Sequence, residues 1–260
     1  MPKYLTVKQV VKNKAAEMYI DGEIVTDEWE DSDTSAAGFR DALKSLGDVK
    51  NINLHINSPG GSVFEGIAIY NMLKQNPAIV NVYVDGLAAS IASVIAMSGD
   101  AIYMPANAMM MIHNPWTLAM GNAEELRKQA DDLDRITESS VQTYLAKAGD
   151  KLDEKTLKEL MDNETWLTAQ EAVDYGLADE VMDANQVAAS ISKQFVQRYH
   201  HVPEQLVEAV QRKQVAPANE KNLQAEERKK LLEHYQTTLK ATTMQLQNMK
   251  GELSNELLSD

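Results

Sequence analysis

Short apolar runs alternate with longer amphipathic stretches over residues 16–183. Runs with β-branched residues or a period of two predict strands, and apolar positions three or four apart predict helices. The strands are expected at 16–25, 52–56, 79–84, 102–104 and 109–112, and the helices at 36–46, 62–75, 88–97, 122–148, 154–161 and 168–176. Such alternation is typical of an α/β fold, in which helices linked by right-handed crossovers cover a sheet.

The composition changes near residue 186. Before this point glycines and short apolar runs are frequent, whereas only Gly251 follows it and glutamines become common. Residues 1–190 carry a net charge of −15 and residues 191–260 a net charge of +1. We therefore predict two parts, a compact domain over 1–185 and an extension over 186–260.

The extension is open to two interpretations. A helix is expected over 203–214 and a break over 215–219, and a heptad seam follows with Leu232, Tyr235, Leu239, Leu246, Met249 and Leu253. About three heptads are marginal for an isolated coiled coil. The extension is thus either a helical docking segment or a partly disordered, self-cleaved tail.

Composition excludes several classes of function. The chain of 260 residues contains no cysteine, which removes disulfide scaffolds, thiolate nucleophiles and cysteine metal sites. Its net charge of −14 argues against a nucleic-acid surface, because phosphate binding needs clustered cations. No apolar run reaches the roughly 18 residues of a membrane span, and the N-terminus lacks a secretory core. We expect a cytoplasmic protein that contacts neither nucleic acid nor membrane.

Three local motifs could support catalysis. The first, over 56–61, places Gly60 and Gly61 between a strand and a helix, where bare amides could stabilise an anion, although a plain turn has the same composition. The second, over 86–92, places Ser90 in the first turn of an apolar, small-residue helix. The third, over 111–115, ends a strand at His113 before a proline turn. Taken singly, Ser90 and His113 could equally be buried structural residues.

Together and in this order, the three motifs resemble the proteolytic subunit of the Clp protease (ClpP), a serine peptidase of the ClpP/crotonase superfamily. The stretches 56–61, 86–93, 111–115 and 165–181 all match that family at compatible separations. The resemblance covers about residues 16–183 and implies a spiral of ββα units with a protruding handle helix, formed here by residues 122–148.

The resemblance also implies roles for single residues. Ser90 would be the nucleophile and His113 the general base, and the amides of Gly61 and Ile91 would form the oxyanion hole. The family usually has aspartate two residues before the aromatic of the last motif, and this chain has Glu164 there. Glu164 is therefore the expected acid, with Asp162 as the alternative. No metal and no cofactor is implied.

The ends of the matching region resemble one branch of the family, the ClpP-related head maturation proteases of tailed phages and prophages. The resemblance implies stacked rings, protein or peptide substrates, and capsid or scaffold partners in the host cytoplasm or on proheads. Whether an ATPase takes part stays open. The alternatives are a housekeeping-type Clp subunit, an acyl-CoA enzyme of the crotonase branch, a Ser-Lys signal peptide peptidase, and a non-catalytic capsid assembly factor.

Overall fold

The computed structural model describes residues 8–10, 15–28, 33–184, 199–204, 206 and 207. All of them belong to the first of the two units into which the chain divides, Met1–Gln211. The expected heptad seam and most of the expected 203–214 helix lie outside the described residues.

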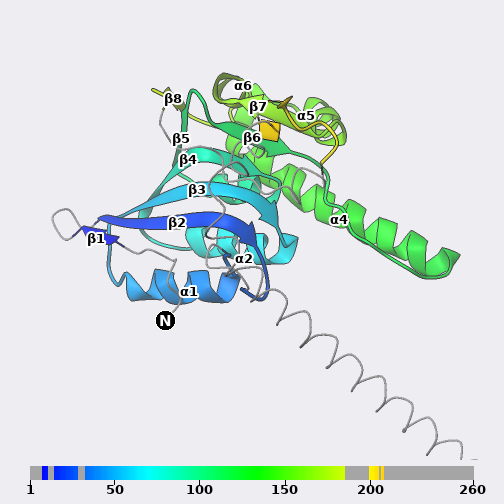
Figure 1. Ribbon diagram of the computed structural model, residues 1–260, viewed down its shortest axis with the longest axis horizontal. Coiled ribbons are helices and arrows are strands. Elements are labelled where there is room, and N and C mark those ends of the chain that lie inside the picture. Colours follow the sequence, from blue (N-terminus) through cyan, green and yellow to red (C-terminus); the bar gives the residue numbers. More distant parts are fainter. Residues whose placement is uncertain (1–7, 11–14, 29–32, 185–198, 205, 208–260) are drawn as a thin grey trace, which may run out of the picture. The chain divides into compact units, whose positions relative to one another are not determined.

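A largely parallel sheet is the centre of this unit (Figure 1). The described strands are β1 (Lys8–Val10), β2 (Ala15–Ile24), β3 (Asn51–Gly61), β4 (Ile79–Ala89), β5 (Ala101–Pro105), β6 (Met109–Ile112), β7 (Thr165–Thr168) and β8 (Glu180–Met182). Six of these strands have the order β1-β2-β3-β4-β5-β8, in which the last five run parallel and β1 pairs antiparallel with β2. Strand β6 pairs parallel with β4 and antiparallel with β7. The predicted α/β fold with a helix-covered sheet is confirmed.

The described helices follow the predicted periodicity. They are α1 (Ala36–Ser45), α2 (Val63–Lys74), α3 (Ile91–Ala96), α4 (Ala123–Ala148), α5 (Glu154–Asp162) and α6 (Ala169–Asp174), with a 3₁₀ turn over Gly149–Lys151. Asn122 and Glu125 form a capping box at the start of α4, and Thr168 and Glu171 form another at the start of α6. Both boxes satisfy backbone N–H groups that have no partner inside the helix.

Strand β4 continues beyond the predicted end at Val84. Its first half pairs with β5 over Asn81–Tyr83, and its second half pairs with β6 over Leu87–Ala89. The prediction that the strand stops at Asp85-Gly86 was wrong, because β6 provides hydrogen-bond partners for the chain after Gly86. The following helix accordingly starts at Ile91 rather than at residue 88.

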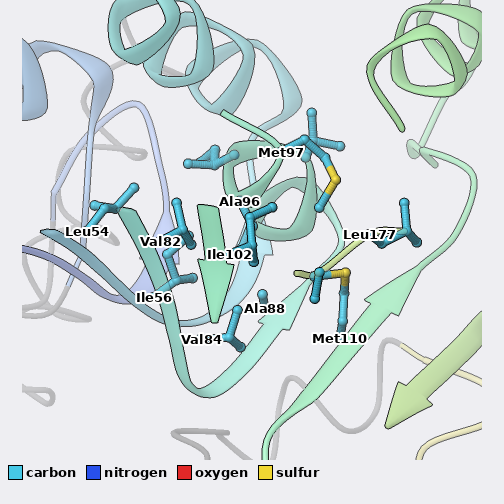
Figure 2. Packing of buried hydrophobic residues seen from close by; sticks show 14 of the residues in the cluster. Leu54, Ile56, Val82, Val84, Ala88, Ala96, Met97, Ile102, Met110 and Leu177 are labelled. Carbon is cyan, nitrogen blue, oxygen red and sulfur yellow. The ribbon is translucent and has the colours of Figure 1, made fainter. Parts of the chain in front are cut away.

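The core lies between the sheet and its helices. Figure 2 shows Leu54 and Ile56 of β3 and Val82 and Val84 of β4 in one packed cluster with Ala96, the last residue of α3, and Met97, which follows it. Ala88, Ile102, Met110 and Leu177 belong to the same cluster. These side chains are almost completely removed from solvent. Each fully buried aliphatic side chain contributes roughly 1.5–3 kcal/mol, so this cluster holds the strand ends rigidly in place.

Helix α4 packs on the domain only through its second half. Val141 and Tyr144 are buried, whereas residues 123–130 are exposed, including the apolar Leu126. The first half projects away from the sheet (Figure 1). The first half of α4 therefore offers a largely polar surface that this domain does not cover.

Candidate active site

Ser90 lies on a sharp turn between β4 and α3. Its backbone has φ 55° and ψ −129°, and it is the residue that caps the N-terminus of α3. Positive φ is strained for a residue with a side chain, and such strain persists only where the surroundings enforce it. The hydrogen bond from Ser90 N–H to Met111 O, at 2.9 Å, is one such restraint. The turn therefore presents the hydroxyl as a nucleophile elbow does, without the Gly-x-Ser-x-Gly sequence.

His113 follows β6 and reaches the same point. Its Nε2 atom lies 2.8 Å from Ser90 Oγ, within hydrogen-bond distance. Burial lowers the pKa of His113 below its ordinary value, and the negative charge of Glu164 offsets only part of that shift. The imidazole is therefore neutral at neutral pH and can accept the serine proton.

Glu164 lies between α5 and β7, in a left-handed backbone conformation with φ 48°. It is only 8% exposed, and its Oε1 accepts hydrogen bonds from the backbone N–H groups of His200 (2.7 Å) and His201 (2.9 Å). Among the residues described, no hydrogen bond joins Glu164 to His113. The carboxylate thus acts on the imidazole through its charge while its oxygen binds another segment of the chain.

Asp162, the alternative acid, lies at the end of α5 and faces elsewhere. Its Oδ1 accepts a hydrogen bond of 2.7 Å from Asn114 Nδ2, at an exposed position. Of the two acids, Glu164 is the one whose charge shifts the pKa of His113.

The glycine turn after β3 lies directly beside Ser90. A Cβ added to Gly60 would lie 2.8 Å from Ser90 Cβ and 2.6 Å from Ala89 O, and one added to Gly61 would collide with Ile24. Both glycines have positive φ, 92° and 149°. Sequence analysis singled out Gly61 for its amide, whereas the close contact with Ser90 is made by Gly60.

Two residues behind the serine turn were missed by the sequence analysis. Ser93 Oγ donates to Ser90 O at 2.6 Å, and Tyr144 OH lies 2.7 Å from Ser93 Oγ. Burial raises the pKa of Tyr144 far above its ordinary value, so the phenol keeps its proton and donates to Ser93. The spacing of 51 residues between Ser93 and Tyr144 leaves no local signal in the sequence.

A cleft of about 520 Å³ opens over Ser90 and His113. Its walls are the end of β2, the turn at Gly60 and Gly61, residues 115–118, and Tyr199. Trp116 and Leu118 are exposed apolar residues on this wall. Tyr199 thus shares this cleft with Ser90 and His113.

The part of the chain that the structure describes holds no group of three metal-ligating side chains. None of the helices in that part combines the length and apolar character that crossing a bilayer would need.

A serine hydroxyl on a strained turn, a neutral histidine within hydrogen-bond distance and a buried carboxylate define the class of serine hydrolases with a Ser-His-acid site. Comparison with known proteins specifies the family. The family model for Clp protease matches residues 12–185, and the chain belongs to this family.

Two of the relatives specify the similarity further. The chain is 35% identical over 164 residues to the ATP-dependent Clp protease proteolytic subunit 3 of Rhodococcus jostii, an alignment that covers 62% of this chain and 80% of the relative. It is 36% identical over 142 residues to the ATP-dependent Clp protease proteolytic subunit of Pleurastrum terricola, covering 54% of this chain and 71% of the relative. The resemblance seen in the sequence is confirmed at the level of the family, and the chain is a serine peptidase.

Proposed function

We propose that this protein is an endopeptidase in which Ser90 is the nucleophile, His113 the general base and Glu164 the acid. The observation that carries the proposal is the 2.8 Å approach of His113 Nε2 to Ser90 Oγ at a strained turn. A neutral imidazole at this distance removes the hydroxyl proton as the oxygen attacks a peptide carbonyl.

The reaction then proceeds in two stages. The attack gives a tetrahedral intermediate, whose oxyanion would be held by the backbone N–H groups of Gly61 and Ile91. The protonated His113 passes its proton to the leaving amine, which leaves an acyl group on Ser90. Water, deprotonated by the same imidazole, attacks the ester and releases the second product. Glu164 stabilises the imidazolium that forms in each stage.

A fluorophosphonate probe tests the nucleophile directly. Intact protein should be labelled at Ser90, and Ser90→Ala should lose both labelling and peptide cleavage while its melting temperature stays within a few degrees, because removing one small hydroxyl creates almost no cavity. Labelling at another serine, or full proteolysis by Ser90→Ala, would remove Ser90 from the mechanism. Ser98, whose buried hydroxyl lies in the same domain, provides the matched control through Ser98→Ala.

For the biological role, we propose maturation of phage heads by cleavage of capsid or scaffold proteins, in stacked rings joined through the projecting half of α4. The support is the match of the ends of the catalytic region to that branch, and the exposed Leu126 on α4. The expected location is the host cytoplasm, including assembling proheads. Co-expression with the major capsid protein of the same genome should give Ser90-dependent cleavage.

The second candidate is a housekeeping-type proteolytic subunit, because both named relatives are called ATP-dependent Clp protease subunits. Cleavage of folded substrates only with a Clp ATPase and ATP, and none of capsid protein, would favour it. The crotonase and Ser-Lys alternatives are disfavoured because their chemistry needs no contact like that between Ser90 and His113. A non-catalytic capsid factor would show no labelling by the probe.

A further inference from the structure

A segment from beyond residue 185 lies across the active site. We define the strap as residues 199–204, 206 and 207. The Tyr199 ring packs edge-on against the His113 imidazole, with centroids 5.2 Å apart and planes at 67°. Its hydroxyl donates to Pro59 O at 3.3 Å, beside the glycine turn. Tyr199 therefore spans the mouth of the cleft that contains Ser90, from the histidine side to the glycine side.

The strap also binds the catalytic acid. Two successive backbone N–H groups, of His200 and His201, converge on Glu164 Oε1 at 2.7 and 2.9 Å. His201 Nδ1–H donates to the carbonyl oxygen of the neighbouring Asn163 at 3.0 Å. Hydrogen bonds to an ionised carboxylate are among the strongest in proteins. They hold Glu164 toward the strap, and His113 receives only the effect of its charge.

An apolar anchor fixes the far end of the strap. Leu206 is 8% exposed and packs with Leu87, Ala89 and Met111, from the strands that lead to Ser90 and His113. This group is separate from the main core, and Tyr199 and Val202 of the strap pack against it. A small satellite cluster of this kind can open while the core remains folded.

A detail beneath the strap disfavours the closed arrangement. Trp166 packs against the same satellite cluster and edge-on against Tyr199, at 6.0 Å between centroids. Its buried indole Nε1 has no hydrogen-bond partner among the described residues. A buried donor without a partner is costly, and opening the strap would allow water to reach this part of the cluster.

We propose that the strap is an autoinhibitory segment that holds the peptidase in a closed state until it lifts from the site. The proposal rests on the proposed function of Ser90, His113 and Glu164. In the closed state Tyr199 occupies the space beside the histidine that an incoming peptide needs, and the strap amides hold the carboxylate. Lifting the strap opens the cleft and releases Glu164 to accept a hydrogen bond from His113 Nδ1.

The full-length variant Leu206→Asp tests the proposal. A carboxylate cannot be buried in the satellite cluster, so the strap should detach while the catalytic residues remain unchanged. We expect the labelling rate of Ser90 by a fluorophosphonate and the kcat/KM for a short fluorogenic peptide to rise about tenfold or more, since burial of one leucine is worth at least that factor. The matched control is Glu204→Gln, an exposed position of the same strap, which should leave both rates unchanged.

Two results would overturn the inhibitory role of the strap. If Leu206→Asp remains folded by its circular dichroism and melting temperature, and its labelling rate and kcat/KM are unchanged or lower, the strap is not inhibitory. Cleavage of the strap itself, seen by mass spectrometry as Ser90-dependent shortening of the wild-type chain, would also overturn the proposal, because the segment would then be a substrate.

Tyr199→Ala provides a second variant should Leu206→Asp fail to fold. It keeps the leucine anchor and the backbone bonds to Glu164 but opens the mouth of the cleft. We expect a rise of severalfold in kcat/KM for the peptide, and no rise in a folded Tyr199→Ala protein contradicts the proposal. Failure of the proposed function looks different, since neither wild type nor any strap variant would then be labelled at Ser90.

Discussion

Two histidines of this domain lie near carboxylates, and their surroundings shift their pKa values in opposite directions. His113 is half-buried beside Ser90, and this partial burial lowers its pKa. His55 lies on β3, with Nδ1 2.9 Å from Asp85 Oδ2 and Nε2 3.1 Å from Glu17 Oε2. Burial lowers the pKa of His55 as well, but its hydrogen bonds and charge interactions with Asp85 and Glu17 outweigh burial and raise it overall.

The packing reinforces the difference. The His55 ring is stacked between Tyr19 and Tyr83, at centroid distances of 4.7 and 5.1 Å, so both its nitrogens and both its faces are engaged. A general base must instead be neutral and keep one nitrogen directed at the proton it will take. The position of the carboxylates thus decides whether a histidine acts as a base or as a charged structural element.

The largest expected effect comes from exchanging each histidine for glutamine. His113→Gln should lower kcat for peptide cleavage by about 10⁴-fold or more, because in the described part of the chain His113 is the side chain hydrogen-bonded to Ser90 Oγ. His55→Gln should change kcat by less than about twofold, since His55 is not a neighbour of the cleft. Steady-state assays on both variants measure the loss of kcat in each. Comparable losses would show that the two histidines do not differ in catalytic role.

The next largest effect on kcat is expected from Glu164, the proposed acid. Glu164→Gln should lower kcat by about 10² to 10⁴-fold, because an amide cannot stabilise the imidazolium. The matched variant Asp162→Asn should cost far less, since Asp162 is exposed and its side chain accepts a hydrogen bond from Asn114 and not from His113. Were Asp162→Asn the more damaging, Asp162 would be the acid.

The pH dependence of kcat/KM tests the interaction between His113 and Glu164. In the proposed mechanism activity requires neutral His113, so kcat/KM should rise with pH through the pKa of His113, at a midpoint below the ordinary 6.5. The charge of Glu164 raises this pKa, and Glu164→Gln should therefore move the midpoint to lower pH. A midpoint above 6.5 in the wild-type protein would contradict the burial of the imidazole.

The smallest expected effect concerns stability at His55. Because the pKa of His55 is raised on folding, its charged form stabilises the fold fully below the unfolded pKa, and this contribution is lost as pH rises through the folded pKa. His55→Gln should thus cost about 1–2 kcal/mol of unfolding free energy near pH 5 and less near pH 9. Urea denaturation at the two pH values measures the unfolding free energy of both proteins. If His55→Gln costs as much at pH 9 as at pH 5, the charge of His55 does not stabilise the fold.

The sequence predicts much of this arrangement, because local patterns determine where strands end. Ser90 and His113 both follow strands of one sheet, and the resemblance to the Clp family had assigned them to a common site before the distance between them was known. The capping residues Asn122 and Thr168 likewise marked the starts of α4 and α6.

Other features depend on contacts between distant parts of the chain and left no local signal. The positive φ of Ser90 is imposed by its surroundings and not by the propensity of serine. The hydrogen bonds to Glu164 come from residues 36 and 37 positions away, in a segment whose composition indicated only an extension. The continuation of β4 required β6 as a partner.

The hydrogen-bonded pair of Ser93 and Tyr144 connects helix α4 to the turn at Ser90. Tyr144 lies in the buried second half of α4, and Ser93 bonds directly to the carbonyl oxygen of Ser90. The exposed first half of the same helix extends about 1.5 Å per residue away from this hydrogen bond. Any displacement of the buried half of α4 would therefore bear, through one phenol and one hydroxyl, on the turn that carries Ser90.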